Sequence, residues 1–176
     1  MTRILVADDD VTACLLMQAS LEKSGFEVLT AENGTDAISQ FHSQQCDLVM
    51  LDVDMPGLNG YQVCEALRED MGNELPIVMV TGLDDLESVE LAFNAGATDF
   101  ISKPINWGLI GHRVSYLLRG YKVLQELHSA NAYNAAILDA IPDKLLRIDS
   151  NGQVIDVRNN STIQKSQNSL KSEHSL

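Results

Sequence analysis

Polar side chains that can do chemistry follow four separate apolar runs of the sequence. The runs span 4–7, 48–51, 77–80 and 100–101, and the residues after them are Asp8 and Asp9, Asp52, Thr81 and Lys103. This group combines three carboxylates, one hydroxyl and one ammonium. If the runs are parallel strands of one sheet, their carboxyl ends deliver these side chains to the same crevice.

Such a group suits metal-assisted phosphoryl transfer. Three carboxylates at close range repel one another, and each resists ionisation unless a cation offsets the charge. An oxygen-only ligand set favours Mg2+, which keeps several waters and also binds a phosphoryl group. Lys103 and Thr81 supply a positive charge and a hydroxyl donor for phosphoryl oxygens. Because none of the five residues is Ser, Cys or His, we expect a carboxylate nucleophile and an aspartyl phosphate product.

Each of these residues also has an ordinary structural explanation. Asp8 and Asp9 could cap the helix that follows, and Asp10 is expected to do so. Lys103 could be a surface lysine before a turn, and Thr81 could be a structural hydroxyl at a strand end. Coincidence is a poor explanation for all of them together on four strand ends, so we predict a functional site.

The elements that must position these residues alternate between strand and helix. Short apolar strands are predicted at 4–7, 26–31, 48–51, 77–80 and 100–101. Helical spacing is visible at 11–24, around 37–41, from about 60 and around 89–93. This alternation implies a parallel sheet covered on both faces and joined by right-handed crossovers. We therefore predict an α/β fold, a doubly wound five-stranded parallel sheet of flavodoxin-like order 2-1-3-4-5, with an extended C-terminal helix.

The negative charge is concentrated in the first part of the chain. Residues 1–104 hold 4 Lys and Arg against 19 Asp and Glu, whereas residues 105–176 hold 8 against 6. This acidity argues against contact of the first part with nucleic acid. The sequence contains no run of about 18 apolar residues, so no membrane span is predicted, and no signal peptide is visible. Three scattered cysteines without a CxxC pair favour reduced thiols and a cytoplasmic location.

Residues 1 to about 120 resemble a response-regulator receiver domain of the CheY-like type over their full length. The matching motifs are ILVADDD, LVMLDVDMPGLNGYQV, IVMVTG and FISKP. The resemblance implies a role in two-component signal transduction, in which a histidine kinase or a histidine phosphotransfer protein donates the phosphoryl group. It also implies that the domain is not an enzyme, beyond its own self-phosphorylation and autodephosphorylation chemistry.

The resemblance assigns the phosphoacceptor and the metal ligands. It implies that Asp52 accepts the phosphoryl group and that Asp8 and Asp9 organise Mg2+ beside it. In such domains the residue two positions after the acceptor, here Asp54, gives its backbone carbonyl to the metal.

The resemblance also assigns the switch. Thr81 and Lys103 would ligate the phosphoryl group, and the small Gly82 would leave access to the acceptor. Phe100 would be the rotating aromatic side chain that changes the surface of the fourth helix, the fifth strand and the fifth helix. The peptide bond between Lys103 and Pro104 is expected to be cis, as is usual in this family.

A phosphatase of the haloacid-dehalogenase type is the alternative from another class. Asp52 and Asp54 resemble the DxD motif of those enzymes, which also use a Thr or Ser, a Lys and a pair of acids. In those enzymes, however, the DxD follows the first strand and the acid pair comes last. Here the acid pair comes first and no cap insertion is visible, so the order of the motifs argues against this alternative.

Residues 106–140 are predicted to form one long helix that continues the last helix of the receiver domain. Apolar residues recur along it alternately four and three apart, the spacing of a coiled-coil seam. The first seam residues are Val114, Leu117, Tyr121 and Leu124. As far as about Leu118, the stripe is expected to cover the sheet. From Tyr121 onward no receiver surface remains to cover it, so we predict a homodimer through this helix.

The segment 141–158 is predicted to form a hairpin around Ser150–Gly152. The run ILDAIPDKLLRIDSNGQVIDVRNN resembles the opening of a PAS sensory domain, which needs on the order of 100 residues. We therefore expect an incomplete PAS-like hairpin, in a chain that is a piece of a longer protein or whose gene ends early. The polar residues 159–176 are expected to be disordered.

The sequence leaves the output open. No helix-turn-helix, cyclase or kinase pattern is visible. Two possibilities therefore remain: a phosphorylation-controlled dimeric module of a larger signalling enzyme, and a stand-alone receiver that works by binding a partner.

Overall fold

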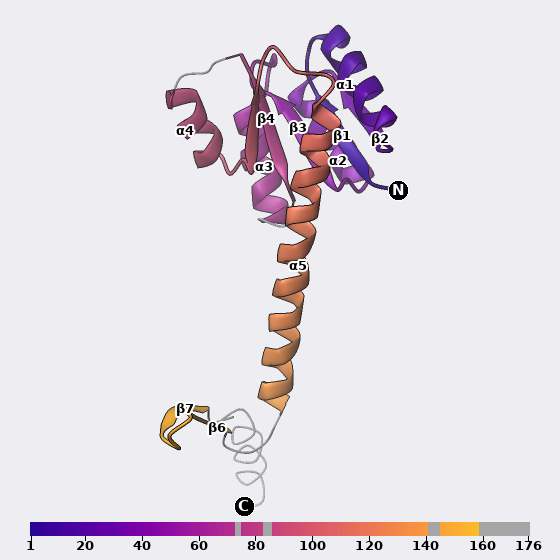
Figure 1. Cartoon of the computed structure of the whole chain (residues 1–176). Helices are drawn as coiled ribbons and strands as arrows, with labels where there is room; N and C mark the ends of the chain where they lie inside the picture. Colours follow the sequence, from indigo (N-terminus) through magenta and orange to yellow (C-terminus); the bar gives the residue numbers. More distant parts are fainter. Residues whose placement is uncertain (73–74, 83–85, 141–144, 159–176) are drawn as a thin grey trace, which may run out of the picture. The chain divides into compact units, whose positions relative to one another are not determined.

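A computed structural model describes residues 1–72, 75–82, 86–140 and 145–158 of the chain (Figure 1). The elements are β1 (Arg3–Ala7), α1 (Val11–Lys23), β2 (Glu27–Ala31), α2 (Gly34–Ser43), β3 (Leu48–Asp52), α3 (Gly60–Met71), β4 (Ile77–Thr81), α4 (Leu86–Asn94), β5 (Asp99–Ser102), α5 (Ile110–Ala140), β6 (Leu145–Ile148) and β7 (Val154–Arg158). By its internal contacts the chain divides into two compact units, Met1–Val123 and Leu124–Leu176.

The first unit contains a five-stranded sheet in the order β2-β1-β3-β4-β5. All four strand pairings are parallel. This result confirms the predicted doubly wound fold and its strand order. In this order β1 and β3 are neighbours that begin crossovers to opposite faces, so a crevice opens beyond their carboxyl ends.

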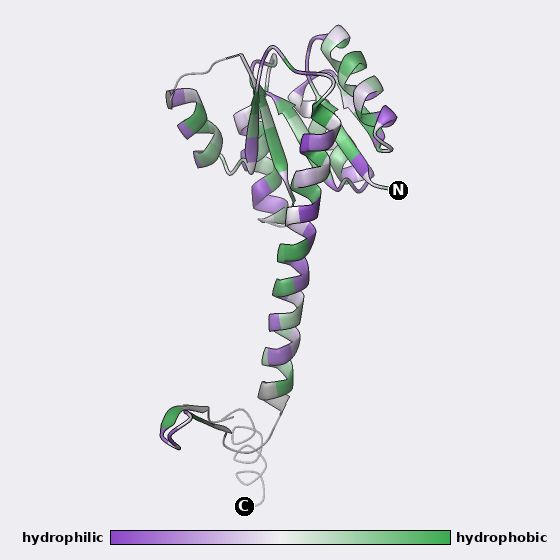
Figure 2. Cartoon of the chain, in the orientation of Figure 1, coloured by the Kyte–Doolittle hydropathy of each residue, from purple (hydrophilic) through white to green (hydrophobic). Residues whose placement is uncertain are grey.

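Side chains alternate between two cores, one on each face of the sheet. In β1, Leu5 belongs to the core under α2, α3 and α4, whereas Ile4 belongs to the core under α1 and α5. β3 and β4 alternate in the same way and are fully buried. β3 and β4 are accordingly mostly hydrophobic, and the helices mix hydrophobic and hydrophilic residues (Figure 2). This burial of both faces explains why the predicted strands read as continuous apolar runs.

Polar residues define the starts of three helices around this sheet. The side chain of Asp10 accepts a hydrogen bond from the backbone N–H of Thr12, which confirms the predicted cap of α1. Asn33 caps α2 in the same way, and Asn59 forms a capping box with Gln62 at the start of α3. Each cap satisfies backbone donors that a helix leaves unpaired at its first turn.

The last helix begins later than predicted. The sequence placed its start at residue 106, whereas α5 starts at Ile110. The side chain of Asn106 accepts from the N–H of Gly108, and its carbonyl accepts from Leu109 and Ile110. This turn uses the residues after Pro104 to redirect the chain, so helical geometry is established only four residues further on.

The second unit contains an antiparallel hairpin. β6 and β7 pair through Leu146 with Val157 and Ile148 with Val154, with an irregularity between Arg147 and Ile148. The predicted hairpin is therefore confirmed, whereas its resemblance to a PAS domain stays a prediction. The predicted disordered tail, 159–176, lies outside the described residues.

Two further sequence expectations can be compared with the structure. Among the described helices, none is both long and apolar enough to cross a membrane. Cys14, Cys46 and Cys64 are free thiols, as their scattered positions predicted.

Candidate functional site

Three carboxylates meet where β1 and β3 end. Ala7 pairs in register with Leu51, so the residues that follow them, Asp8 and Asp52, lie side by side. Asp8, Asp9 and Asp52 each offer a carboxylate oxygen, and these oxygens lie within 4.8 Å of one another. Asp8 is fully buried and Asp52 almost so, whereas Asp9 is exposed. The cluster therefore opens to solvent on the side of Asp9.

Lys103 brings a positive charge to this cluster from the end of β5. Its Nζ lies 2.7 Å from Oδ1 of Asp52 and 3.1 Å from Oδ2 of Asp8. The ion pair between Asp8 and Lys103 joins residues 95 positions apart in the chain. The structure thus brings the predicted acids and the predicted lysine together at one site.

Burial sets the ionisation of the two groups in closest contact. Desolvation raises the pKa of Asp52 above its ordinary value, and the nearby charge of Asp8 raises it further, against the lowering effect of Lys103. For Lys103 burial alone would lower the pKa, but its hydrogen bonds and ion pairs with Asp52 and Asp8 outweigh burial and raise it. Lys103 is therefore held as a cation, and it only partly offsets the repulsion between the acids.

Backbone contacts fix the position of Asp8. Its Oδ1 accepts a hydrogen bond of 2.9 Å from the N–H of Asp10, and its Oδ2 faces Lys103. Its carbonyl accepts from Sγ of Cys14, and its N–H donates to the carbonyl of Ala31. These contacts hold the carboxylate of Asp8 in one orientation, as a metal or phosphoryl ligand requires.

Thr81 and Phe100 lie on the strands beside the acid cluster. Thr81 is the last residue of β4 and is buried, and its carbonyl accepts from the N–H of Lys103. Phe100 on β5 is half-buried, and its ring meets the ring of Phe93 on α4 edge-on, with centroids 6.3 Å apart. An added Cβ at Gly82 would meet no atom of the described residues within 4 Å.

The connection after β5 agrees with the sequence expectation. The peptide bond between Lys103 and Pro104 is cis.

Gly60 is a residue that the sequence analysis did not single out. A Cβ on Gly60 would collide with the backbone carbonyl oxygen of Asp52. Its N–H donates to the carbonyl of Val53 at 3.1 Å. The first residue of α3 therefore packs directly on the backbone that carries Asp52. Only its place in LVMLDVDMPGLNG, eight residues after Asp52, could have drawn attention to it.

The donor set fits the predicted magnesium ion. Three carboxylates in one crevice, with a single lysine beside them, leave a net negative charge that a divalent cation offsets. All the acidic ligands offer oxygen, which Mg2+ prefers. Asp54 lies in the loop after β3 with its side chain exposed, so its carboxylate adds no buried charge to the cluster.

The predicted seam residues on α5 fall into two groups. Val114 is fully buried in the core under α1 and α5, and Leu117 packs partly against that core. Val114 therefore has no surface left for a partner helix and does not join the predicted seam between two chains. Its burial agrees with the expectation that the stripe covers the sheet as far as about Leu118. Leu117 and Tyr121 are half-buried and Leu124 is 52% exposed, so these three side chains keep some surface for a partner.

Comparisons with known proteins agree with this geometry. The family model for the response regulator receiver domain matches residues 4–115. The response regulator PleD of Caulobacter vibrioides is 34% identical over 159 residues, which cover 85% of this chain and 35% of PleD. The alkaline phosphatase synthesis transcriptional regulatory protein PhoP of Bacillus subtilis is 37% identical over 117 residues, which cover 66% of this chain and 48% of PhoP.

Solved structures give the same result. The crystal structure of a CheY-like response regulator receiver domain protein from Methanospirillum hungatei JF-1 has a TM-score of 0.65 and 26% identity. The match covers 69% of this chain and 97% of that one. The chain spans less than half the length of PleD and of PhoP, but it contains nearly all of the solved domain. This chain belongs to the response regulator receiver domain family.

Proposed function

We propose that the first unit accepts a phosphoryl group on Asp52 from a histidine kinase or a histidine phosphotransfer protein. The observation that carries this proposal is the meeting of three carboxylate oxygens within 4.8 Å, with Nζ of Lys103 2.7 Å from Asp52. Asp8, Asp9, Asp52 and the backbone carbonyl of Asp54 would hold Mg2+. The family match, together with the order of the motifs, argues against the haloacid-dehalogenase alternative.

The transfer follows from this arrangement. A carboxylate oxygen of Asp52 attacks the phosphorus of the donor phosphohistidine, and a P–O bond forms as the P–N bond breaks. The imidazole nitrogen leaves with the bonding electron pair and takes a proton from solvent. Bound Mg2+ supplies charge neutralisation for the phosphoryl oxygens. Lys103 exchanges its contact with Asp52 for a phosphoryl oxygen, and the hydroxyl of Thr81 donates to another. Attack by water on phosphorus later breaks the P–O bond and restores Asp52.

The switch would use the residues beside the acceptor. Phosphorylation adds about −1.5 to −2 charge. Thr81 moves toward this charge, and the ring of Phe100 fills the space that Thr81 leaves. Because Phe100 contacts Phe93 on α4, its rotation alters the surface of α4, β5 and α5. The phosphoryl group shifts this equilibrium only by the difference in its contacts with the two states.

The signal would pass onward through a homodimer that forms along α5 from Tyr121. Support for a partner comes from the exposed apolar side chains on this part of the helix, Val123, Leu124, Leu127, Tyr133 and Ile137. Two possibilities for the output remain, as in the sequence: a module of a larger signalling enzyme, and a stand-alone receiver that binds a partner. A mass measurement with and without beryllofluoride and Mg2+ tests the dimer. A monomer under both conditions, well above micromolar concentration, would defeat it.

Labelling by a small acyl phosphate tests the acceptor. In the presence of Mg2+, intact mass should show one added phosphoryl group, and Asp52→Asn should abolish it. Asp54→Asn is the matched control, because only the backbone carbonyl of Asp54 is assigned to the metal, and this variant should still be labelled. Undiminished labelling of Asp52→Asn, or sustained turnover of a generic phosphatase substrate, would refute the proposal.

A further inference from the structure

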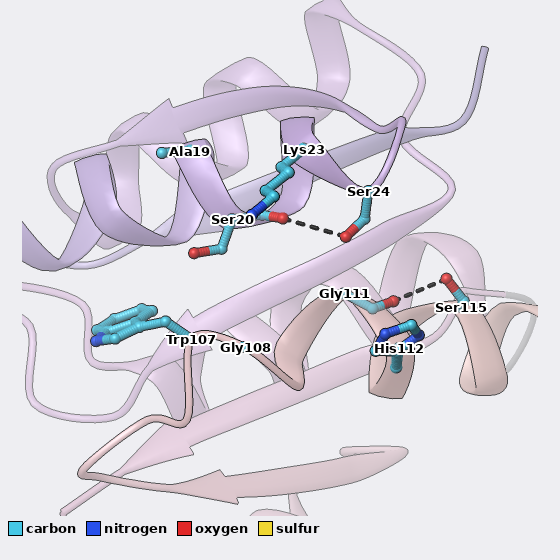
Figure 3. A pocket seen from close by; sticks show the side chains of 9 residues that line it. All are labelled: Ala19, Ser20, Lys23, Ser24, Trp107, Gly108, Gly111, His112 and Ser115. Atoms are coloured by element: carbon cyan, nitrogen blue, oxygen red, sulfur yellow. Dashed lines mark hydrogen bonds between the residues drawn. The ribbon is translucent and has the colours of Figure 1, made fainter.

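A groove of about 820 Å³ lies between α1 and α5 (Figure 3). The last turns of α1 form one wall, and the first turns of α5 form the other. Trp107, in the turn before α5, lines the groove and packs partly against the core beneath it. In Figure 3 the indole of Trp107 and the side chain of Ser20 face each other across the groove.

Close packing of the two helices creates the floor of this groove. An added Cβ at Gly111 would collide with Oγ of Ser24, so the two helices approach closely at this point. The hydroxyls of Ser24 and Ser115 donate back to carbonyls of their own helices, Ser20 and Gly111. The floor therefore offers small side chains with satisfied polar groups, a surface on which another helix can pack closely.

The groove is basic, although the first part of the chain is strongly acidic. Its described lining includes Lys23 and His112 and contains no Asp or Glu. Along α5, Arg119 lies seven residues after His112 and Lys122 lies three residues after Arg119, spacings that place these side chains on one face of the helix. Within the described part of the chain, no ion pair involves Lys23, Arg119 or Lys122. We call His112, Arg119, Lys122 and Lys23 the basic stripe.

The length of the basic stripe argues for an extended occupant. From His112 to Lys122 it follows the helix for about 15 Å, at 1.5 Å per residue. The charges of Arg119 and Lys122, three residues apart on α5, match a second helix that carries acids at the same spacing. A small anion would engage only part of such a row.

The basic stripe is also separate from the other surfaces already described. Lys23 ends α1, whereas the acid cluster lies beside its start, about 20 Å away along the helix at 1.5 Å per residue. On α5 the stripe lies about 160° around the helix from the line through Val114, Leu117, Tyr121 and Leu124, at 3.6 residues per turn. An occupant of the stripe would therefore leave both the acceptor and the proposed dimer contact free.

We propose that the groove and the basic stripe bind an acidic helical segment of a partner protein. The charge of the stripe is complementary to such a segment and opposite to that of the rest of the domain, so it also orients the partner as it approaches. The proposal does not depend on phosphorylation of Asp52.

Trp107 gives a direct test, because it is the single tryptophan of the chain. The whole chain is titrated with a synthetic helical peptide of Glu, Ala and Leu, and separately with its Lys counterpart, while tryptophan emission is recorded. We expect the acidic peptide alone to change the emission, and the effect to weaken as salt rises to about 0.15 M. Lys23→Gln with Arg119→Gln should weaken binding about three- to tenfold, since each exposed charge pair contributes modestly.

Gln45→Glu is the charge-matched control for Lys23→Gln alone, which is measured beside the double variant. It alters the net charge by the same amount as Lys23→Gln, at an exposed position on the loop after α2, and should leave binding unchanged. Circular dichroism checks that each variant is folded. An equal response to both peptides, or unchanged affinity in the double variant, would overturn the proposal. A second copy of the chain that covers Trp107 in the absence of peptide would also overturn the proposal, and sedimentation would detect such a dimer. Labelling by acyl phosphate is measured on the same variants, so failure of the acceptor and failure of the groove are distinguished.

Discussion

Replacing Gly60 by alanine tests how closely α3 supports Asp52, the proposed acceptor. A Cβ at this position would collide with the carbonyl oxygen of Asp52 and approach Cα of Val53 to 3.1 Å. Both neighbours are backbone atoms, so no flexible side chain can move aside. The alanine variant must therefore shift either the start of α3 or the end of β3, which carries the acceptor.

The size of the effect follows from two opposing contributions. Overpacking a well-filled site costs about 1–3 kcal/mol. Alanine is favoured over glycine in a helix by about 0.5–1 kcal/mol, and less at a helix start. We therefore expect Gly60→Ala to lower the free energy of unfolding by about 1–2 kcal/mol. The shift of the Asp52 backbone should also slow acyl-phosphate labelling.

Gly120→Ala is the matched control on the same scaffold. At Gly120, inside α5, an added Cβ would meet no described atom within 4 Å. The same substitution should therefore raise the free energy of unfolding by about 0.5–1 kcal/mol.

Urea denaturation followed by Trp107 emission measures both variants, since Trp107 lies in the first unit. For a slope of about 2 kcal/mol per M, the two midpoints should differ by roughly 1 M, on opposite sides of the parent. A Gly60→Ala variant as stable as the parent, and labelled as fast, would refute the reasoning.

Four other perturbations follow from the structure. Lys103→Met removes the cation 2.7 Å from Asp52 and should slow acyl-phosphate labelling at least about tenfold; an unchanged rate would contradict its role. Mg2+ should raise the melting temperature, with a stabilisation of about 2.7 kcal/mol at 100 times the dissociation constant, and Asp8→Asn should remove most of this shift. Burial raises the pKa of Cys46 to about 11 from 9.0, so its thiolate fraction at pH 8 is about 100-fold smaller than that of an ordinary cysteine. Alkylation of Cys46 by a thiol reagent should therefore speed up about tenfold per pH unit, and alkylation in the folded protein as fast as in the urea-unfolded chain would argue against this. Arg68→Ala removes four hydrogen bonds, to the carbonyls of Gly72, Leu75 and Gly96 and to Thr98. At about 0.5–1.5 kcal/mol each, urea denaturation should show a loss of about 2–6 kcal/mol in the free energy of unfolding.

Much of the fold could be predicted because burial leaves a direct mark on the sequence. A strand covered on both faces needs apolar residues throughout, and 48–51 and 77–80 satisfy this requirement with no polar interruption. The site could be predicted for the same reason. A charged residue such as Asp52 stands out at the end of such a run, and parallel strands bring their carboxyl ends to one edge.

The parts that could not be predicted depend on contacts between distant residues. The seam spacing of Val114 is the same whether its side chain meets a sheet or a second helix. The sequence predicts that the stripe covers the sheet as far as about Leu118, but only the fold shows how completely each side chain is buried, and Val114 is fully buried. Likewise Gly60 and Gly111 are glycines because another backbone or side chain approaches them, and no local pattern records that approach.

Lys103 connects the acid cluster to the segment that leads into α5. Its ammonium contacts Asp8 and Asp52, while its N–H donates to the carbonyl of Thr81. It is followed directly by Pro104 and by the turn of Asn106 that starts α5. A phosphoryl group of about −1.5 to −2 charge competes with both carboxylates for this one ammonium. Any shift of Lys103 toward it therefore pulls on a short, internally bonded connection whose far end is the first turn of α5. Val114, further along α5, is fully buried in the core. We therefore expect a shift of Lys103 to reorient the first turn of α5. The variant Lys103→Arg keeps the positive charge but changes the contacts with Asp8 and Asp52. It should therefore alter the position of the segment that leads into α5.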